Sequence, residues 1–505
     1  MKVQMNWDAA AAAVRAAADW ADDAPGGAVV LFDTDGVRAS AAAGVESLAT
    51  RVPFGVESVV RYASVTKHVF ASFVLAEADV IGLDDPLGAH LPALAPLTAA
   101  VTVRQALGMT GGLPDTREAL TLLGLSVFTQ SFAPDLLAFH TALPGLNYPA
   151  GTEVHYSNGG YRLVEEALRG HGRLFDDYLR DHLRGPHGLG FKAAEMWTDP
   201  VRGLCPGYWH DGRGWQVGLQ GMHLSAAGSL TGSARDLAAW GGLLLRGEGE
   251  FAGRLAALSA TGHLRDGRAT GYGLGMRHHM VGGRDLVGHG GSQPGFKSYI
   301  LLDPLAGAGC IVVANRDDVN STALAERVMA ALYGAALPVA ENAMTPGLYV
   351  APTGADWIEV NAQAVTRLDD TIAVYPDGAG GVDSRAPTSP LHLRMEGEDV
   401  VGTAGHAPAR FQPARPEAVP ATLDGLWRAD PFGAMLEIYR GAVVMGAGPT
   451  RRAMPLQSLG GGRYLFTLHD GPWVRRVCLN EMGGDRFQLA LSRARSVEYR
   501  RISGS

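Results

Sequence analysis

Ser64 and Lys67 are a pair of residues whose types and spacing suit covalent chemistry. They lie three positions apart in the segment Ser64-Val65-Thr66-Lys67, a spacing that places both side chains on one face of a helix. A serine hydroxyl is a weak nucleophile until a base removes its proton, and a lysine buried away from water is able to act as that base. The alternative is a serine that caps a helix beside a solvated lysine.

Lysine is rare in this chain, which favours the catalytic interpretation. Of the 43 Lys and Arg residues, four are lysine: Lys2, Lys67, Lys192 and Lys297. Arginine provides positive charge, but it stays protonated and is unable to serve as a base. A lysine that is retained in such a chain therefore indicates a chemical role, and we predict that role for Lys67.

A second candidate group is Tyr156-Ser157-Asn158. A tyrosine beside a cationic lysine has a lowered pKa and is able to pass protons. The Asn158 amide has donors and an acceptor, so it is able to hold a lysine and a substrate carbonyl at once. In isolation this segment is more simply a turn, because Gly159 and Gly160 follow Asn158.

The third group is His289-Gly290-Gly291-Ser292, which follows the apolar pair Leu286-Val287. Glycines such as Gly291 on an edge strand let another backbone approach, so a substrate peptide is able to pair with this edge. The backbone N–H groups of Ser292 and Ser64 would then form an oxyanion hole. The alternative is an ordinary glycine-rich hairpin with a surface histidine.

The elements around these groups have the pattern of an antiparallel sheet with helices packed against it. Residues 8–22 have a helical pattern, and residues 64–80 are apolar almost all round, which predicts a buried helix. A hairpin is predicted around Asp35-Gly36. The other strand candidates of this part are residues 286–288, 299–302 and 310–314.

The pattern changes near residue 335, beyond which we find alternation and turns but no convincing long helix. Gly347-Leu348-Tyr349 has a counterpart in Gly425-Leu426-Trp427, and Phe411 and Tyr499 close the two segments similarly. We predict two small antiparallel all-β domains of similar plan, each a closed barrel because closure removes exposed edges. The strand candidates are residues 357–360, 372–375, 391–395, 435–439, 442–445, 464–468 and 487–491.

Two linkers, residues 337–346 and 415–420, separate these segments. The predicted fold class is therefore an α/β (α+β) catalytic domain followed by two small β-barrel domains. The predicted domains are residues 1–335, 346–415 and 421–505.

The three motifs in this order resemble the serine β-lactamase and penicillin-binding-protein superfamily, whose pattern is S-x-x-K, Y-x-N, then K-T-G or H-x-G. The resemblance covers about residues 25–335 and extends to Thr110-Gly111-Gly112-Leu113-Pro114 and Gly271-Tyr272-Gly273-Leu274-Gly275. It implies a helical subdomain beside an α/β sandwich, with the active site between them. It also implies an acyl-enzyme on Ser64, with Lys67 and Tyr156 as proton carriers and no metal or cofactor.

His289 stands where the β-lactamase branch has a lysine that helps to bind a substrate carboxylate. This difference favours esterases, amidases and aminopeptidases. With two C-terminal β domains, the chain is most similar to D-stereospecific aminopeptidases, which release small residues such as D-alanine from peptides or amides. In such enzymes a loop of the last domain enters the cleft, which implies that Asp470 receives the substrate ammonium. The alternative is that Asp470-Gly471 is a hairpin turn.

Two other functions stay open. One is a broad esterase or amidase of the same superfamily, in which the barrels serve assembly. The other is a ligand-binding or scaffold protein with a degenerate hydrolase domain, against which the intact Ser64, Lys67 and Tyr156 argue.

Composition limits the partners. A net charge of −8 argues against nucleic acid, and no stretch reaches the ~18 apolar residues of a membrane span. The three cysteines lie far apart, which fits a reducing compartment. We therefore expect a cytoplasmic protein that acts on a small peptide or amide. A homodimer is the candidate assembly.

Overall fold

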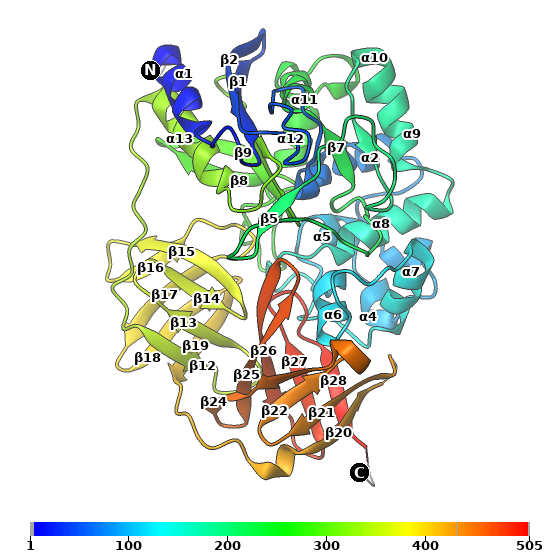
Figure 1. Cartoon of the computed structure of the whole chain (residues 1–505), viewed down its shortest axis with the longest axis vertical. Helices are drawn as coiled ribbons and strands as arrows, with labels where there is room; N and C mark the ends of the chain where they lie inside the picture. Colours follow the sequence, from blue (N-terminus) through cyan, green and yellow to red (C-terminus); the bar gives the residue numbers. More distant parts are fainter. Residues whose placement is uncertain (1–4, 431, 503–505) are drawn as a thin grey trace. The chain divides into compact units, whose positions relative to one another are not determined.

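The structure is a computed structural model that describes residues 5–430 and 432–502 (Figure 1). The chain divides into two compact units. The first consists of Met1–Asp85, Tyr161–Gly262 and Ala269–Leu337. The second consists of Pro86–Gly160, His263–Arg268 and Pro338–Ser505.

The first unit is built on a six-stranded antiparallel sheet in the order β2-β1-β11-β10-β9-β8 (Figure 1). All the strands predicted from the sequence for this part are present in it. Its strands are β1 (Gly27–Asp33), β2 (Gly36–Ala43), β8 (Arg277–Val281), β9 (Arg284–Gln293), β10 (Phe296–Asp303) and β11 (Ala308–Ala314).

Helices cover both faces of this sheet. On one face α1 (Trp7–Ala17) and α13 (Ser321–Tyr333) bury alternate residues of the strands, such as Leu31 and Tyr299. On the other face α11 (Ala234–Arg246) packs so closely that a Cβ atom at Gly241 would meet the Phe32 ring at 2.5 Å. The central strands β1, β10 and β11 are buried on both faces for this reason, which explains their largely apolar sequences.

Smaller elements complete the first unit. The helices are α2 (Thr66–Ala76), α8 (Gly159–Gly170, which belongs to this unit from Tyr161 onward), α9 (Phe175–Tyr178), α10 (Gly185–His187) and α12 (Arg254–Ser259). The short strands are β3 (Val60–Arg61), β4 (Lys192–Ala193), β5 (Tyr208–His210), β6 (Trp215–Val217) and β7 (Leu230–Gly232).

The second unit begins with short helices that precede and follow the Thr110–Pro114 segment. Asp115 caps α6 by accepting a hydrogen bond from the Glu118 N–H at 3.1 Å, which satisfies one of the free donors at the start of the helix. These helices are α3 (Leu87–His90), α4 (Pro96–Ala99), α5 (Val103–Leu107), α6 (Thr116–Leu122) and α7 (Ala133–Ala142).

The first β domain is a closed antiparallel barrel, as predicted. Its interior is filled by apolar side chains, including Ile358, Val374 and Phe411. The first and last strands pair through Tyr349 and Pro413, which closes the barrel. The strands are β12 (Gly347–Val350), β13 (Trp357–Val360), β14 (Ala364–Arg367), β15 (Asp370–Pro376), β16 (Gly381–Ser384), β17 (Leu391–Glu396), β18 (Asp399–Ala404) and β19 (Ala407–Pro413).

The second β domain is a nine-stranded antiparallel sheet in the order β23-β22-β21-β20-β28-β27-β26-β25-β24. The Arg452 guanidinium of β23 donates to the His469 carbonyl of β25, so the sheet curls into a nearly closed barrel. The predicted closure is thus complete only in the first β domain. The strands are β20 (Gly425–Ala429), β21 (Ala434–Tyr439), β22 (Ala442–Met445), β23 (Arg452–Pro455), β24 (Gln457–Gly460), β25 (Arg463–Asp470), β26 (Trp473–Glu481), β27 (Arg486–Ala490) and β28 (Val497–Arg501).

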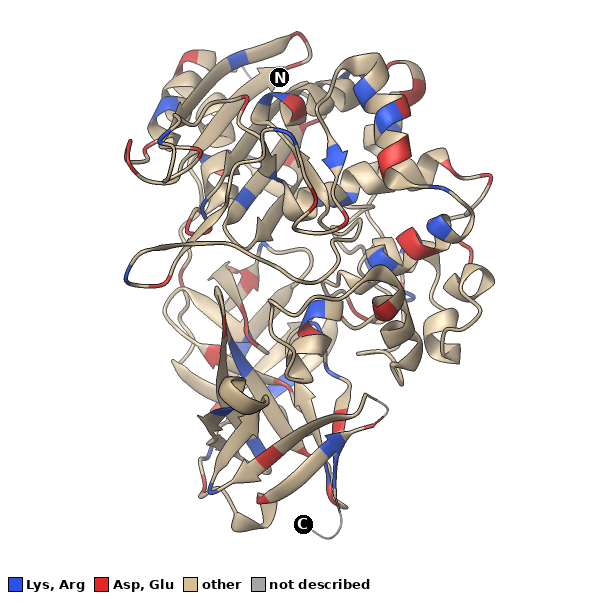
Figure 2. Ribbon diagram, turned by 45° about the vertical axis from the view of Figure 1, so that its right-hand side comes forward, with Lys and Arg blue, Asp and Glu red and all other residues tan. Residues whose placement is uncertain are grey.

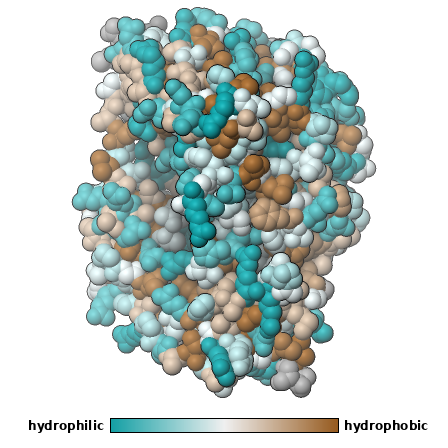
Figure 3. Space-filling model, in the orientation of Figure 1, coloured by the Kyte–Doolittle hydropathy of each residue, from teal (hydrophilic) through white to brown (hydrophobic). Residues whose placement is uncertain are grey.

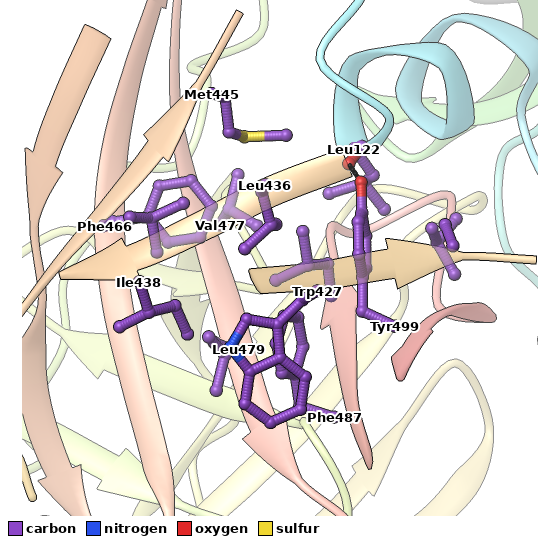
Figure 4. Packing of buried hydrophobic residues seen from close by; sticks show 14 of the residues in the cluster. Leu122, Trp427, Leu436, Ile438, Met445, Phe466, Val477, Leu479, Phe487 and Tyr499 are labelled. Carbon is purple, nitrogen blue, oxygen red and sulfur yellow. Dashed lines mark hydrogen bonds between the residues drawn. The ribbon is translucent and has the colours of Figure 1, made fainter. Parts of the chain in front are cut away.

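The core of the second β domain extends to helix α6 (Figure 4). The rings of Trp427 and Phe487 lie 4.6 Å apart, and those of Phe487 and Tyr499 lie 5.3 Å apart. The Tyr499 hydroxyl donates a hydrogen bond of 2.9 Å to the Leu122 carbonyl at the end of α6. The C-terminal strands are therefore tied to the helical segment that precedes Tyr156 in sequence.

Charged residues of both signs are scattered over both units (Figure 2). The face seen in Figure 3 likewise mixes hydrophilic and hydrophobic residues. Among the described residues, no helix combines the length and the apolar character that crossing a membrane requires.

Candidate active site

Ser64 lies in a 3₁₀ turn, Ala63–Val65, that leads directly into α2. The helix begins at Thr66, two residues later than the sequence predicted. Ser64 is partly exposed, whereas Ala63 and Val65 are buried. Ala63 has a φ of +50°, a conformation that residues with a side chain rarely adopt and that tends to occur at functional sites.

One local hydrogen bond and two from distant segments hold this strained turn. The Thr66 hydroxyl donates to the Ala63 carbonyl at 2.5 Å and accepts from the Leu230 N–H at 3.0 Å. The Ser298 hydroxyl of β10 donates to the Tyr62 carbonyl at 2.6 Å. The strain is therefore supported by the sheet and by β7, which keeps the Ser64 hydroxyl in a defined place.

Lys67 is completely buried, one helical turn after Ser64. Its Nζ atom donates hydrogen bonds to Ser64 Oγ at 3.1 Å and to the Ala227 carbonyl at 2.7 Å. The Tyr161 ring lies on another side, with its centroid 5.2 Å from Nζ. The lysine thus has the burial that the sequence interpretation required, and it reaches the serine hydroxyl directly.

His289 is also completely buried, and both of its ring nitrogens have partners. Nδ1 donates to the Gly290 carbonyl at 2.6 Å, which leaves Nε2 to accept from the Tyr272 hydroxyl at 3.1 Å. Burial, and then the charges of Arg277 and Lys67, hold the pKa of His289 well below its usual value. The imidazole is therefore neutral, and its direct contact with a substrate stays a prediction.

The segment that carries Gly291 and Ser292 runs along the Ser64 turn. A Cβ atom at Gly291 would lie 2.0 Å from the Tyr62 carbonyl oxygen, so only glycine fits there. The Gln293 amide donates to the Gly228 carbonyl at 2.9 Å, next to the loop that receives Lys67. Strand β8 pairs with β9 from Arg284 to Gly288, and the predicted substrate edge begins at the next residue.

Tyr156 and Asn158 belong to the second unit, where they are fixed by Asp115 and Arg493. The Asp115 carboxylate accepts from the Asn158 N–H at 2.9 Å and from its Nδ2 at 2.7 Å. This contact directs the donor end of the Asn158 amide toward Asp115 and leaves the carbonyl end for other partners. Asp115 follows the Thr110–Pro114 segment, and sequence reasoning gave it no role.

Arg493, in the loop between β27 and β28, packs over the Tyr156 ring at 4.7 Å from the centroid. Its carbonyl accepts from the Asp115 N–H at 2.8 Å, and its N–H donates to Glu118 at 2.6 Å. Burial would raise the pKa of Asp115, but the Arg493 charge and the bonds from Asn158 and Glu118 lower it below its usual value. The C-terminal domain thus supplies a cation to the tyrosine motif, through a loop that no sequence signal singled out.

Replacing Asp115 with asparagine is expected to lower kcat about tenfold or more. The carboxylate receives two hydrogen bonds from Asn158, and bonds to a charged group contribute roughly 1.5–3 kcal/mol each. The measurement is steady-state hydrolysis of an aminoacyl p-nitroanilide by both proteins. Asp135→Asn is the control, because that carboxylate lies on an exposed first turn and accepts from the Phe132 N–H at 3.2 Å. An unchanged kcat in Asp115→Asn would show that Asn158 needs no such anchor.

Asp470 ends β25 at the predicted hairpin, where Gly471 has a φ of +58°. The residue is 5% exposed. Its two oxygens accept from the Ser126 hydroxyl and the Val127 N–H, both at 2.6 Å. The carboxylate thus anchors a loop of its own unit, in keeping with the turn interpretation, and its role as an ammonium receptor stays a prediction.

The substitution Asp470→Asn separates these two roles. The structural role predicts a lower thermal unfolding temperature, because the new amide is unable to accept from both Ser126 and Val127 as the carboxylate does. The ammonium role predicts in addition a roughly 10- to 150-fold fall in kcat/KM for free-amine substrates relative to N-acetylated ones. Thermal unfolding and the ratio of the two kcat/KM values are the measurements. An unchanged ratio would leave Asp470 with the structural role alone.

Metal binding has no candidate group here: in residues 5–430 and 432–502, no three or more His, Cys, Asp or Glu residues are grouped so as to hold an ion.

Known proteins share this architecture. The octameric penicillin-binding protein homologue from Pyrococcus abyssi superposes with a TM-score of 0.54 at 16% identity, over 95% of this chain and 96% of that one. A D-amino acid amidase from Ochrobactrum anthropi SV3 superposes with a TM-score of 0.52 at 21% identity, over 65% of this chain and 98% of that one. At these identities the likeness concerns the fold, and it agrees with the fold class predicted from the sequence.

Sequence comparison gives the family. A D-aminopeptidase from Brucella melitensis is 27% identical over 386 residues, which are 74% of this chain and 70% of that protein. The model of the family described as beta-lactamase matches residues 10–334, the range that holds Ser64, Lys67, Tyr156 and His289. On this match over more than half of its length, the chain belongs to the beta-lactamase family and is a serine hydrolase of that superfamily.

Proposed function

We propose that this hydrolase forms an acyl-enzyme on Ser64 and releases small N-terminal D-residues, such as D-alanine, from peptides or amides. The observation that carries the proposal is the buried Lys67 Nζ, 3.1 Å from Ser64 Oγ. A nucleophile within reach of a base is what covalent catalysis needs. The D-residue preference is supported by the D-aminopeptidase name of the Brucella relatives.

The reaction divides into two halves. Lys67 takes the proton from Ser64 Oγ as that oxygen bonds to the substrate carbonyl carbon, and the N–H groups of Ser64 and Ser292 stabilise the oxyanion. The proton then passes, through Tyr156, to the leaving amine as the C–N bond breaks. Water attacks the resulting ester, gives a proton to the same base and frees the D-amino acid, which restores Ser64.

The test uses the p-nitroanilides of D-alanine, L-alanine and N-acetyl-D-alanine. We expect release of p-nitroaniline mainly from D-Ala-p-nitroanilide, with much lower kcat/KM for the other two. The three substrates measure separately whether the protein hydrolyses the anilide bond, which stereoisomer it prefers and whether it requires a free amine. Equal or faster cleavage of the N-acetyl compound would contradict the aminopeptidase proposal.

The second candidate function is a broad esterase or amidase of the same family. The separate observation in its favour is that Asp470, the carboxylate expected to select free amines, already has two donors of its own. Cleavage of an N-acylated ester at a much higher kcat/KM than any free-amine amide would establish this alternative. A non-enzymatic scaffold has less support, because the strained Ser64 turn and Lys67 are intact.

A further inference from the structure

Helix α8 carries two buried charged side chains that the proposed reaction does not use. Arg162 and Glu165 lie three residues apart on neighbouring turns of the helix, and they are 2% and 8% exposed. Charged groups are seldom buried to this extent unless they are paired or hydrogen-bonded. Their partners therefore indicate what the two side chains contribute.

Both side chains bind the segment 223–227. Arg162 Nη2 donates to the His223 carbonyl at 2.8 Å, and Nη1 donates to His223 Nδ1 at 3.1 Å. Glu165 Oε2 accepts from the Ala226 N–H at 2.9 Å. The helix therefore holds this segment near both of its ends.

The carbonyl that holds the catalytic lysine lies one residue after the N–H that bonds to Glu165. The Ala227 carbonyl accepts from Lys67 Nζ at 2.7 Å, and Nζ in turn donates to Ser64 Oγ at 3.1 Å. Tyr161, four residues before Glu165 and on the same face of α8, has its ring centroid 5.2 Å from Nζ. One face of α8 thus contacts Lys67 directly through Tyr161 and indirectly through Glu165.

The next residue of the helix, Glu166, has the same side chain and a similar burial but a different partner. It is 7% exposed, and its carboxylate pairs with Arg169 at 3.9 Å, one turn further along α8. Glu166 therefore provides a matched comparison for Glu165, because its ion pair lies within the helix itself.

The bond to Ala226 does not require Glu165 to be charged. Burial raises the pKa of Glu165 to about 7, against the Ala226 bond and the charges of Arg162 and Arg169, which lower it. A protonated carboxyl group keeps a carbonyl oxygen as acceptor, and so does an amide. Glutamine at this position should therefore keep the bond, whereas an apolar side chain would leave a buried N–H without its partner.

We propose that Glu165 is a positioning residue, which fixes the Ala227 carbonyl and thereby the Nζ atom of Lys67. Arg162 supports it from the other end of the segment. The inference rests on the proposed function, in which Lys67 takes the proton of Ser64, and it assigns helix α8 a part in that step. A displacement of a reacting group by about 1 Å can lower a rate roughly 100-fold, so the place of this carbonyl matters to the proton transfer.

The experiment measures the rate at which a fluorophosphonate labels the intact protein. In this reaction Ser64 Oγ bonds to phosphorus, fluoride leaves and the base takes the Ser64 proton, so the rate constant reports activation of the serine. The final extent of labelling counts the competent sites. We expect Glu165→Met to lower the rate constant roughly 10- to 100-fold, whereas Glu165→Gln and the control Glu166→Met should retain most of it. A lower extent of labelling or a lower unfolding temperature with an unchanged rate constant would reject the proposal.

A double variant tests whether Glu165 acts through Lys67. Once the amine is absent, loss of Glu165 should add nothing, so Lys67→Ala and the double variant Lys67→Ala, Glu165→Met should be labelled at the same slow rate. A further fall in the double variant would show that Glu165 affects Ser64 by another route, and would reject its positioning role. If Glu165→Met fails to fold, Glu165→Asp takes its place, because it withdraws the acceptor oxygen by one methylene group.

Hydrogen exchange measures the hold on the segment 223–227 independently of the proposed function. Mass spectrometry of the peptide that contains this segment should show faster exchange in Glu165→Met than in the wild type, Glu165→Gln and Glu166→Met. If this holds while the fluorophosphonate labels no serine of the wild type, the proposed function fails and the hold of Glu165 on the segment stands. Unchanged exchange in Glu165→Met, or faster exchange with an unchanged labelling rate, rejects the proposal.

Discussion

Ser64→Ala is expected to reduce kcat by a factor on the order of 10⁴ or more, because no other group of the turn replaces the nucleophile. The loss should be accompanied by little change in thermal unfolding. The substitution removes one partly exposed hydroxyl, while the buried Ala63 and Val65 continue to pack the turn. Turnover of D-Ala-p-nitroanilide and of a p-nitrophenyl ester, together with a thermal unfolding curve, measures both effects.

The control for this variant is Ser72→Ala on the same helix. Ser72 is buried and its hydroxyl bonds to the Tyr178 hydroxyl at 3.0 Å. Loss of this bond should lower the unfolding temperature while leaving kcat nearly unchanged, the reverse of the Ser64 result. If Ser64→Ala still hydrolyses substrate at more than a few per cent of the wild-type rate, Ser64 is not the nucleophile.

Lys67→Arg is expected to lower kcat by roughly 10²- to 10⁴-fold, the usual contribution of a positioned general base. Arginine keeps the positive charge but stays protonated, so it is unable to accept the Ser64 proton. Lys67→Ala should be about equally damaging, because both variants lack the base. Pre-steady-state acylation by a p-nitrophenyl ester isolates the step that should be slowed.

Lys192→Arg is the matched control for Lys67→Arg, because Lys192 contributes only its positive charge. It lies in a partly exposed ion pair with Asp176, and arginine maintains such a pair, so activity should be retained. The base role of Lys67 is contradicted if Lys67→Arg acylates at nearly the wild-type rate while Lys67→Ala does not. In that outcome the positive charge, and not proton transfer, would be what Ser64 requires.

Local signals predicted the elements around Ser64 well. The apolar run after Ser64 forms α2, because every side of that helix meets other buried residues. The short echoes at Gly347 and Gly425 also proved informative. They begin β12 and β20, the strands that pair with the last strands β19 and β28 of their domains. Turns and strands of this kind are determined by patterns within a few residues, so they can be predicted from the sequence alone.

Contacts between segments that lie far apart in the chain could not be predicted from the sequence. Arg493 packs over Tyr156 and bonds to Glu118 only because the second β domain and α6 share one core. Lys297 was conspicuous as a rare lysine, but its place opposite Ser292 depends on the register of the β9–β10 hairpin. Likewise, the occupied oxygens of Asp470 follow from the way its hairpin meets the Ser126 loop.

The most direct test of the account is covalent labelling of the intact protein with a fluorophosphonate, followed by mass determination and peptide mapping. We expect one adduct per chain at Ser64 and no adduct in Ser64→Ala. Labelling of Lys67→Arg should be slow, because the Lys67 Nζ that accepts the proton lies 3.1 Å from Ser64 Oγ in the folded protein. An adduct that maps to any other serine, or rapid labelling of Ser64→Ala, would contradict the account.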